Sequence, residues 1–314
     1  MAFEAKTQAF SSSVNTVVIG TGDRAVTLGG GNTLPFYSFD APIENTPKIG
    51  VEITDAGISA FPQKGLQDFY AGCSSPAEMA KRAENMAGAD FLCLHFEGAD
   101  PNGENKSVED CVAVAKAVAE ASSLPLVILG CKNLEKDAQL FAAIAEALQG
   151  KNILLLSARE ENYKAVGASA GLAYGQKVGA ESSVDINLAK QLNVLLCQLG
   201  VAPSNIVMNA GSAAAGYGFE YLASTLDRIR AAALAQGDDQ LQMPIITPVS
   251  TETWGVKESI MSQADMPQWG DAEERGIEME IATAAACLAG GSDAVILRHP
   301  AAVKTIAEMI AALV

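Results

Sequence analysis

Most of the chain repeats one pattern, in which a short apolar run is followed by a polar or glycine-rich loop and then by an amphipathic stretch. The apolar runs are continuous rather than alternating, which is typical of parallel strands covered on both faces. Eight of these runs predict strands at residues 49–53, 90–96, 126–129, 153–156, 176–181, 206–209, 244–247 and 294–297.

The stretches between the runs carry helix signals. Ser75 followed by Pro76 predicts a capped helix start. In residues 185–200 apolar side chains recur every three or four positions, with Asp185 placed to cap the helix and Gly200 to end it. The same spacing predicts a last helix that carries Val303, Ile306, Ile310 and Leu313.

Eight strand–helix units in one chain predict an α/β fold, a (β/α)8 TIM barrel, rather than a doubly wound open sheet, which needs fewer strands. The N-terminal part differs. Two β-prone runs, 14–19 and 25–28, flank a Gly-Thr-Gly-Asp turn and predict a hairpin that plugs the bottom of the barrel. We therefore divide the chain into an N-terminal extension, residues 1–46, and a barrel, residues 47–314.

Composition excludes several classes of protein. The chain has 49% hydrophobic and 18% charged residues, too apolar to be disordered, and a net charge of −16, which disfavours nucleic acid and anionic membranes. It has no apolar stretch of the ~18 residues that a membrane span needs. Its start lacks a basic region followed by an apolar run, so we expect no secretory signal and a cytoplasmic location.

The six cysteines are scattered and form no C-x-x-C pair, which predicts reduced, mostly buried thiols and no zinc or iron–sulfur site. With only His95 and His299 present, a multi-histidine metal site is excluded. The segment around His95 matches two of the three positions of the Asp-x-His-x-x-Gly motif of cobamide carriers. Because Cys93 stands at the Asp position, we interpret His95 as a packed or capping residue.

In such barrels the working face is built by the loops that follow the strands. The chain has neither a G-x-S-x-G elbow nor a phosphate-binding P-loop, and we assign no catalytic residue. Asp55, Glu97 and Asp100 are candidates for a carboxylate pair, or equally for helix caps.

Two of these loops stand out. The loop after residue 209 contains Gly211, Gly216 and Gly218, which let backbone approach a flat ligand or a phosphate, or serve only a tight turn. The stretch 250–270 contains both tryptophans and two methionines. It predicts a surface for a partner or flat ligand, or a self-packed lid with short helices of its own.

Several segments together resemble a known family. They are Leu-Gly-Gly-Gly-Asn-Thr-Leu-Pro-Phe-Tyr-Ser-Phe-Asp at 28–40, Pro-Lys-Ile-Gly-Val-Glu-Ile-Thr-Asp at 47–55, Ala-Asp-Pro-Asn at 99–102 and Thr-Glu-Thr-Trp-Gly-Val-Lys-Glu at 251–258. The chain resembles, along essentially its whole length, the small subunit of the corrinoid iron–sulfur protein, homologous to the delta subunit of archaeal acetyl-CoA decarbonylase/synthase.

The resemblance implies a (β/α)8 barrel that pairs with a large subunit as a heterodimer. The large subunit of that family carries the iron–sulfur cluster and a corrinoid domain, and the cobamide lies between that domain and the top of the barrel. A methyltransferase moves the methyl group of methyltetrahydrofolate onto cobalt, and acetyl-CoA synthase receives it, in the reductive acetyl-CoA (Wood–Ljungdahl) pathway of anaerobes. A reductive activator is a further expected partner.

On this basis we expect a methyl-carrier subunit without a complete active site of its own. Barrel geometry, rather than a transferred motif, suggests strand-end residues as its cobamide contacts: Asn209, Gly211, Ser212, Thr247, Ser250, Trp254, Arg298 and His299.

Two other classes stay open. One is a pterin-binding methyltransferase of the same barrel class, which would hold a pterin ring with acids and amides such as Asp55, Asp100 and Asn209. The other is a barrel aldolase or isomerase, for which only Lys132 lies near a suitable position.

Overall fold

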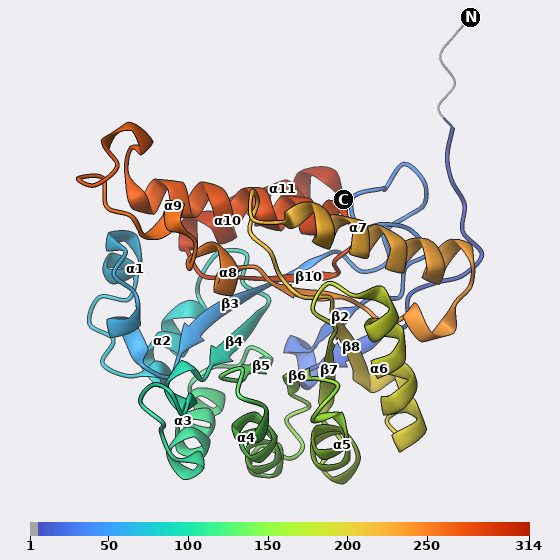
Figure 1. Cartoon of the computed structure of the whole chain (residues 1–314), viewed down its shortest axis with the longest axis horizontal. Coiled ribbons are helices and arrows are strands. Elements are labelled where there is room, and N and C mark those ends of the chain that lie inside the picture. The colour runs from blue at the N-terminus through green and yellow to red at the C-terminus, as the bar shows by residue number, and fades with distance from the viewer. Residues whose placement is uncertain (1–5) are drawn as a thin grey trace, which may run out of the picture.

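The computed structural model describes residues 6–314, and within them eight parallel strands form a barrel beside a separate antiparallel hairpin (Figure 1). The barrel strands pair in the order β8-β7-β6-β5-β4-β3-β10-β9. A single bridge between Met208 and Ile245 links the two outermost strands of this order. The predicted TIM barrel is confirmed, and the open doubly wound sheet is wrong.

The strand positions follow the apolar runs closely. The barrel strands are β3 (Lys48–Thr54), β4 (Phe91–His95), β5 (Leu126–Leu129), β6 (Leu154–Ala158), β7 (Lys177–Glu181), β8 (Ile206–Asn209), β9 (Ile246–Pro248) and β10 (Ala294–Leu297). Only β9 begins clearly later than predicted. Pro244 has no N–H for a ladder, and regular pairing with β10 starts at Ile246.

Helices cover the outside of the barrel. They are α1 (Lys64–Phe69), α2 (Pro76–Ala83), α3 (Val108–Ala121), α4 (Leu134–Ala147), α5 (Tyr163–Val166), α6 (Ile186–Leu199), α7 (Phe219–Arg230), α8 (Ser250–Thr253), α9 (Lys257–Ile260), α10 (Ala272–Ala289) and α11 (Pro300–Leu313). In Figure 1, α2 to α6 lie on one side of the strands, and α7, α10 and α11 lie on the other.

The predicted helix ends are confirmed. Ser75 accepts a hydrogen bond from the Glu78 N–H, and Asp185 accepts two from the first turn of α6. Gly200 ends α6 in the left-handed conformation, with φ 110°, where a residue with a Cβ would be strained. These signals act within one helical turn, which explains why they could be read from the sequence.

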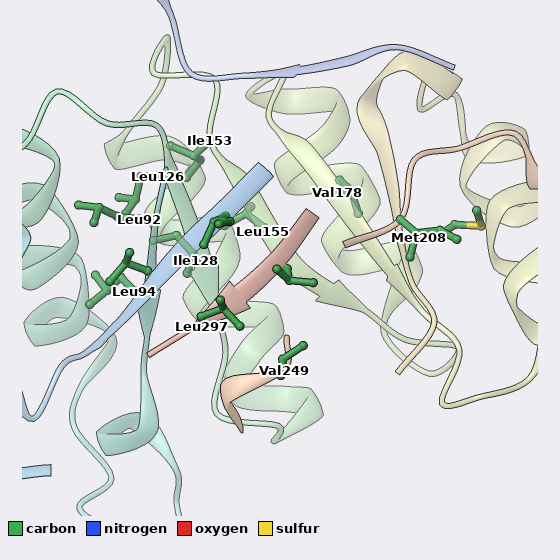
Figure 2. Close-up of a cluster of buried hydrophobic side chains, with 14 of the residues drawn as sticks. Leu92, Leu94, Leu126, Ile128, Ile153, Leu155, Val178, Met208, Val249 and Leu297 are labelled. Atoms are coloured by element: carbon green, nitrogen blue, oxygen red, sulfur yellow. The ribbon is translucent and has the colours of Figure 1, made fainter. Parts of the chain in front are cut away.

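Alternate residues of each strand pack into two different hydrophobic cores, one between the strands and the helices and one inside the barrel. On β4, Leu92 and Leu94 point outward and pack against the helix layer, together with Ile128 and Leu155 of the neighbouring strands (Figure 2). Their neighbours Phe91 and Cys93 point into the barrel. A strand with one face on the helices and one inside the barrel is buried on both sides, hence its continuous apolar sequence.

The hairpin closes the bottom of the barrel, as predicted. It consists of β1 (Val17–Ile19) and β2 (Val26–Leu28), paired antiparallel. The buried side chains of Val17, Ile19, Val26 and Leu28 form one cluster with the barrel interior. Val18 points the other way and is 38% exposed.

The cysteines are free, as expected; Cys93, Cys111 and Cys287 are buried, and the other three are half-buried. None of the helices in residues 6–314 is both long and apolar enough to cross a membrane.

Candidate functional site

The carboxyl ends of the barrel strands form a polar mouth above an apolar interior. The inward positions of β3 pass from Gly50 to Glu52, and those of β4 pass from Cys93 to His95. Arg298 directly follows β10, two positions after the inward-facing Ile296. Because side chains alternate along a strand, strand parity points all three polar residues to the inside of the barrel.

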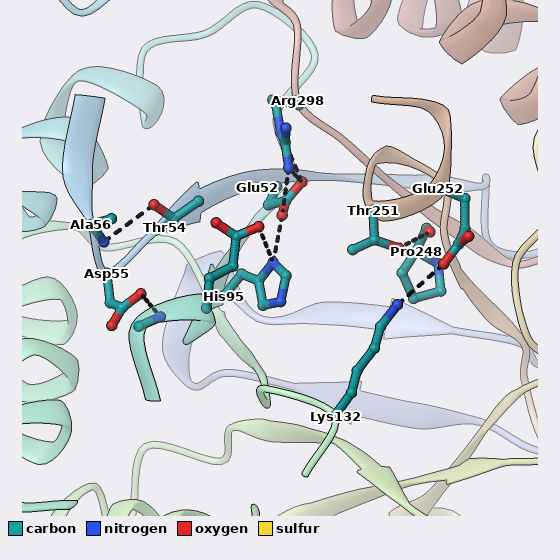
Figure 3. Close-up of polar contacts among 12 residues, drawn as sticks. Glu52, Thr54, Asp55, Ala56, His95, Lys132, Pro248, Thr251, Glu252 and Arg298 are labelled. Carbon is teal, nitrogen blue, oxygen red and sulfur yellow. Dashed lines mark hydrogen bonds and ion pairs between the residues drawn. The ribbon is translucent and has the colours of Figure 1, made fainter. Parts of the chain in front are cut away.

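Glu52 is the centre of this polar layer. Its side chain is fully buried and accepts hydrogen bonds from Arg298 Nε and Nη2, at 3.1 Å each (Figure 3). Its Oε1 also lies 2.8 Å from His95 Nδ1. Burial would raise the pKa of the Glu52 carboxyl, but the positive charge of Arg298 and the bond to His95 hold that pKa well below its usual range.

Glu97 lies next to the hydrogen-bonded side chains of Arg298, Glu52 and His95, and with it the group contains residue types that bind metal ions. Ligand atoms of Glu52, His95 and Glu97 lie within 4.8 Å of one another. However, both Glu52 oxygens are bound to Arg298, and His95 Nδ1 faces Glu52. A cation would have to displace a buried guanidinium, so the arrangement fits an ion-pair network better than a metal centre.

A pocket of about 50 Å³ opens beside this network at the mouth. Two ion pairs border it: Lys132 with Glu252 at 3.2 Å, and Arg159 with Glu181 at 2.5 Å. Figure 3 shows Lys132 reaching from the loop after β5 to Glu252 on α8. These two pairs balance each other's charge, and Asp137, the fifth charged residue of the lining, accepts the Cys131 N–H at 2.8 Å, so the pocket has no excess positive charge to attract an anionic ligand.

Three of the predicted cofactor contacts line this pocket: Asn209, Gly211 and Ser212. Asn209 Nδ2 donates to Ser157 Oγ at 3.1 Å, and its Oδ1 accepts the Gly211 N–H at 3.1 Å. Gly211 has φ 96°, so the turn that returns its N–H to Asn209 depends on glycine.

Two further predicted contacts, Thr247 and Ser250, are fully buried. Thr247 lies on the outward side of β9, and its hydroxyl is 2.7 Å from that of Ser292. Ser250 begins α8, and its hydroxyl has no hydrogen-bond partner among the described residues. Direct contact of either residue with a cofactor stays a prediction.

The remaining three predicted contacts are engaged within the chain. Trp254 packs against Gly276 of α10, where a Cβ would lie 2.2 Å from the indole, and stacks on His299 with ring centroids 5.9 Å apart. Arg298 is paired with Glu52 and lies over the Phe61 ring, 4.8 Å from its centroid. These contacts within the chain hold the three side chains in place, and their contact with a cofactor stays a prediction.

The candidate carboxylate pair is not assembled. Asp55 accepts the Gly98 N–H at 3.0 Å and pairs with Lys106 at 3.1 Å. Asp100 instead accepts the Asn102 N–H at 2.9 Å, in a local turn. Neither side chain caps a helix, so the alternative interpretation is not confirmed for them either: Asp55 ties together two loops at the strand ends, and Asp100 closes a local turn.

The stretch 250–270 is a self-packed segment with short helices, as one of the two interpretations predicted. It contains α8, α9 and a single 3₁₀ turn at Pro267–Trp269. Arg275 of α10 fixes it by donating to the carbonyls of Glu258, Met261 and Gly270. The Arg275 guanidinium also lies 5.7 Å from the Trp269 ring.

Glu52 and Glu280 were not identified from the sequence. Glu280 is fully buried on α10, and its two oxygens accept the backbone N–H groups of Arg298 at 2.6 Å and His299 at 3.1 Å. The expectation of apolar strands overlooked Glu52, although a single acid inside an apolar strand was a visible signal. For Glu280, on a helix with other acids, the sequence offered no comparable signal.

Comparison with known proteins relates almost the whole chain to one family. Residues 16–308 match the family described as CO dehydrogenase/acetyl-CoA synthase delta subunit. The chain is 32% identical, over 98% of its length and 70% of the relative's, to the acetyl-CoA decarbonylase/synthase complex subunit delta of Archaeoglobus fulgidus. It is also 32% identical to subunit delta 2 of Methanosarcina acetivorans, over 92% of this chain and 66% of that protein.

Solved structures support the fold. A dihydropteroate synthase of Xanthomonas albilineans with 4-aminobenzoic acid superposes with a TM-score of 0.58 at 14% identity, over 95% of this chain and 98% of that one. The Yersinia pestis enzyme with a pterine-sulfa conjugate gives 0.55 at 13% identity, over 85% and 93%. At these identities the likeness concerns the barrel and not its chemistry.

Proposed function

The chain belongs to the CO dehydrogenase/acetyl-CoA synthase delta subunit family, and from this premise we propose that it is the barrel subunit of a corrinoid iron–sulfur protein. The chain spans 66 to 70% of the length of the first two relatives, so the proposal concerns the barrel part of such proteins. Its task is to cover a cobamide held by a large partner subunit.

The proposed reaction is methyl transfer in the acetyl-CoA pathway. A methyltransferase supplies the methyl group of methyltetrahydrofolate, acetyl-CoA synthase receives it, and a reductive activator restores the carrier. When bound, the cobamide supplies the chemistry, since its cobalt accepts and releases the methyl group. The iron–sulfur cluster belongs to the large subunit of the proposed heterodimer, and the six free cysteines of this chain suit the reducing cytoplasm of an anaerobe.

The mouth fits a cover for a corrin. Its charges are paired, as in Lys132 with Glu252 and Arg159 with Glu181, and a corrin has a mostly neutral edge that carries amide groups. Its pocket of about 50 Å³ is far below the ~300 Å³ of ordinary ligand pockets. A large ring would therefore rest on the rim rather than enter the barrel, leaving its other face to the partner subunit.

Asn209, Gly211 and Ser212 are the residues that we place against the ring. They form the part of the mouth that combines a nearly buried amide with small side chains. The contact between Arg298 and Glu52 holds the opposite wall in place. The single observation that carries the proposal is family membership along almost the whole chain.

The pterin-binding methyltransferase is the second candidate. Asn209 at the mouth favours it, since an amide can pair with a pterin edge. The two acids that it also needs are engaged elsewhere, Asp55 with Lys106 and Asp100 with the Asn102 N–H. We therefore rank it below the carrier subunit.

Co-production with the large subunit tests the proposal. The wild-type pair should purify as a heterodimer that retains a cobamide, seen by its visible absorbance. Ser212→Trp places a bulky side chain in the mouth. We expect it to lower the affinity of the pair for the cobamide about tenfold or more, because the indole blocks the surface on which the corrin ring would bind.

Ser123→Trp is the matched control. Ser123 is exposed and precedes β5 at the opposite end of the barrel, so the same bulk there should leave cobamide retention unchanged. If the pairs with wild type, Ser212→Trp and Ser123→Trp retain cobamide equally, the cobamide does not bind at the mouth. Saturable methyltetrahydrofolate binding by the chain alone, with methylation of free cobalamin, would favour the second candidate.

A further inference from the structure

The two histidines of the chain use their ring nitrogens differently. His299 uses both: Nδ1 accepts the Ala301 N–H at 3.1 Å, and Nε2 lies 3.0 Å from Glu273 Oε1. His95 binds Glu52 through Nδ1 at 2.8 Å, and its Nε2 has no hydrogen-bond partner within residues 6–314. One ring is thus satisfied inside the chain, and the other has an unused nitrogen.

The surroundings of His95 determine which nitrogen carries the proton. Glu52 is ionised, because Arg298 and His95 lower the pKa of its carboxyl, and an ionised carboxylate only accepts hydrogen bonds. Nδ1 of His95 therefore carries a hydrogen and donates it. In the neutral ring this leaves a lone pair on Nε2, which is the way an outer carboxylate prepares a histidine for a ligand.

His95 lies at the carboxyl end of its strand, at the end of the barrel that carries the mouth. His95 ends β4, and its register partner on β5, Leu129, lines the mouth pocket. Figure 3 shows the His95 ring bonded to Glu52 through one nitrogen, with its second nitrogen pointing away from that carboxylate. The side chain is 8% exposed, so only a small part of the ring can be reached from outside.

We infer that His95 Nε2 accepts a hydrogen bond from an amide N–H at the edge of the bound corrin, and that Glu52 and Arg298 are positioning residues for this contact. The inference rests on the proposed function and deepens it. A lone pair needs a donor, and the acetamide and propionamide groups of a corrin edge supply neutral N–H donors. No charged ligand is needed, in agreement with the balanced rim.

Nitrogen NMR of the two histidine rings tests the inference. The chain, labelled with ¹⁵N-histidine, is combined with the unlabelled large subunit, with and without diamagnetic cobalt(III) cobamide. His299→Asn serves for assignment, because asparagine can still cap α11. We expect the His95 Nε2 resonance to shift on loading with cobamide, while both His299 nitrogens keep their positions.

Two variants separate contact from positioning. His95→Asn can still donate an amide N–H to Glu52 from the position of Nδ1 but has no atom in the place of Nε2, and should weaken cobamide binding roughly 2- to 10-fold, as for one hydrogen bond. In Glu52→Gln the His95 ring should lose its fixed Nδ1–H tautomer, and its two ring nitrogens should then show averaged chemical shifts. If Glu52 only packed against the ring, the substitution would leave these shifts unchanged. If this variant fails to fold, the wild-type spectra still decide.

The outcomes distinguish this inference from the proposed function. If the pair retains cobamide and the His95 signals do not move, the inference is wrong and the carrier function stands. A shift that occurs already in the cobamide-free pair assigns the donor to the partner protein and likewise overturns it. If the pair binds no cobamide at all, the proposed function itself fails.

Discussion

Glu52 and Glu280 are both fully buried near Arg298, yet their environments affect the two carboxyl pKa values in opposite directions. Burial alone raises both. Glu52 is paired with the Arg298 guanidinium and His95, which more than offset burial. Glu280 meets mainly backbone N–H groups, which offset it only partly, and its pKa rises from 4.5 to about 7.

The raised pKa of Glu280 predicts a pH dependence of stability. Between its unfolded value of 4.5 and about 7, the folded chain binds more protons at this position than the unfolded chain. The free energy of unfolding therefore falls as pH rises, by about 3 kcal/mol for this group. Urea unfolding of wild type and Glu280→Gln from about pH 5 to about pH 8 should show that the free energy of unfolding of wild type, measured relative to the variant, falls as pH rises.

Glu52 does not interfere with this measurement. Its lowered pKa contributes stability that is lost only as pH falls below the usual range of a carboxyl. A constant difference between wild type and Glu280→Gln over the whole interval would contradict the assignment of the proton to Glu280.

At the scale of elements, the hairpin is part of the barrel's core. Ile19 is fully buried in the interior cluster, whereas its neighbour Val18 is 38% exposed on the other face of the same strand. The alternation along β1 thus separates a packing position from a surface position one residue away.

This alternation gives a prediction with an internal control. Ile19→Ala should lower the free energy of unfolding by about 2–5 kcal/mol, because it leaves a cavity in the barrel. Val18→Ala should change it by about 0.5 kcal/mol or less. Urea unfolding of both variants checks this, and equal effects would show that the hairpin does not plug the barrel.

For the molecule as a whole, the mouth is the end of the barrel left open, since the hairpin occupies the other. Its loops come from segments far apart in the chain, including 130–133 and 210–218. The net charge of −16 over the whole chain disfavours the binding of phosphate backbones.

Hydrogen exchange of the assembled pair therefore has an expected pattern. Binding of the large subunit with its cobamide should slow exchange of the amides in 130–133 and 210–218, because the cover excludes water. The hairpin strands β1 and β2 should exchange at the same rate in both forms. Protection centred on the hairpin would place the partner at the wrong end of the barrel.

The sequence by itself determined the elements and their order. Continuous apolar runs marked the strands, and Ser75, Asp185 and Gly200 marked helix ends, because these signals depend on neighbours within a few residues. The eight repeats then implied a barrel, and the apolar hairpin implied its plug. Asn209, Gly211 and Ser212 were placed at the mouth for the same reason, since the first ends a strand and the other two follow it closely.

Only the tertiary structure decided which polar residues meet. Glu52 and Arg298 are 246 residues apart, and barrel closure brings β10 beside β3 so that they pair. The same closure engages both nitrogens of His299 and leaves Nε2 of His95 without a partner in the described chain. A side chain's direction depends on strand parity and its partner on closure, and neither is contained in the local pattern of residues.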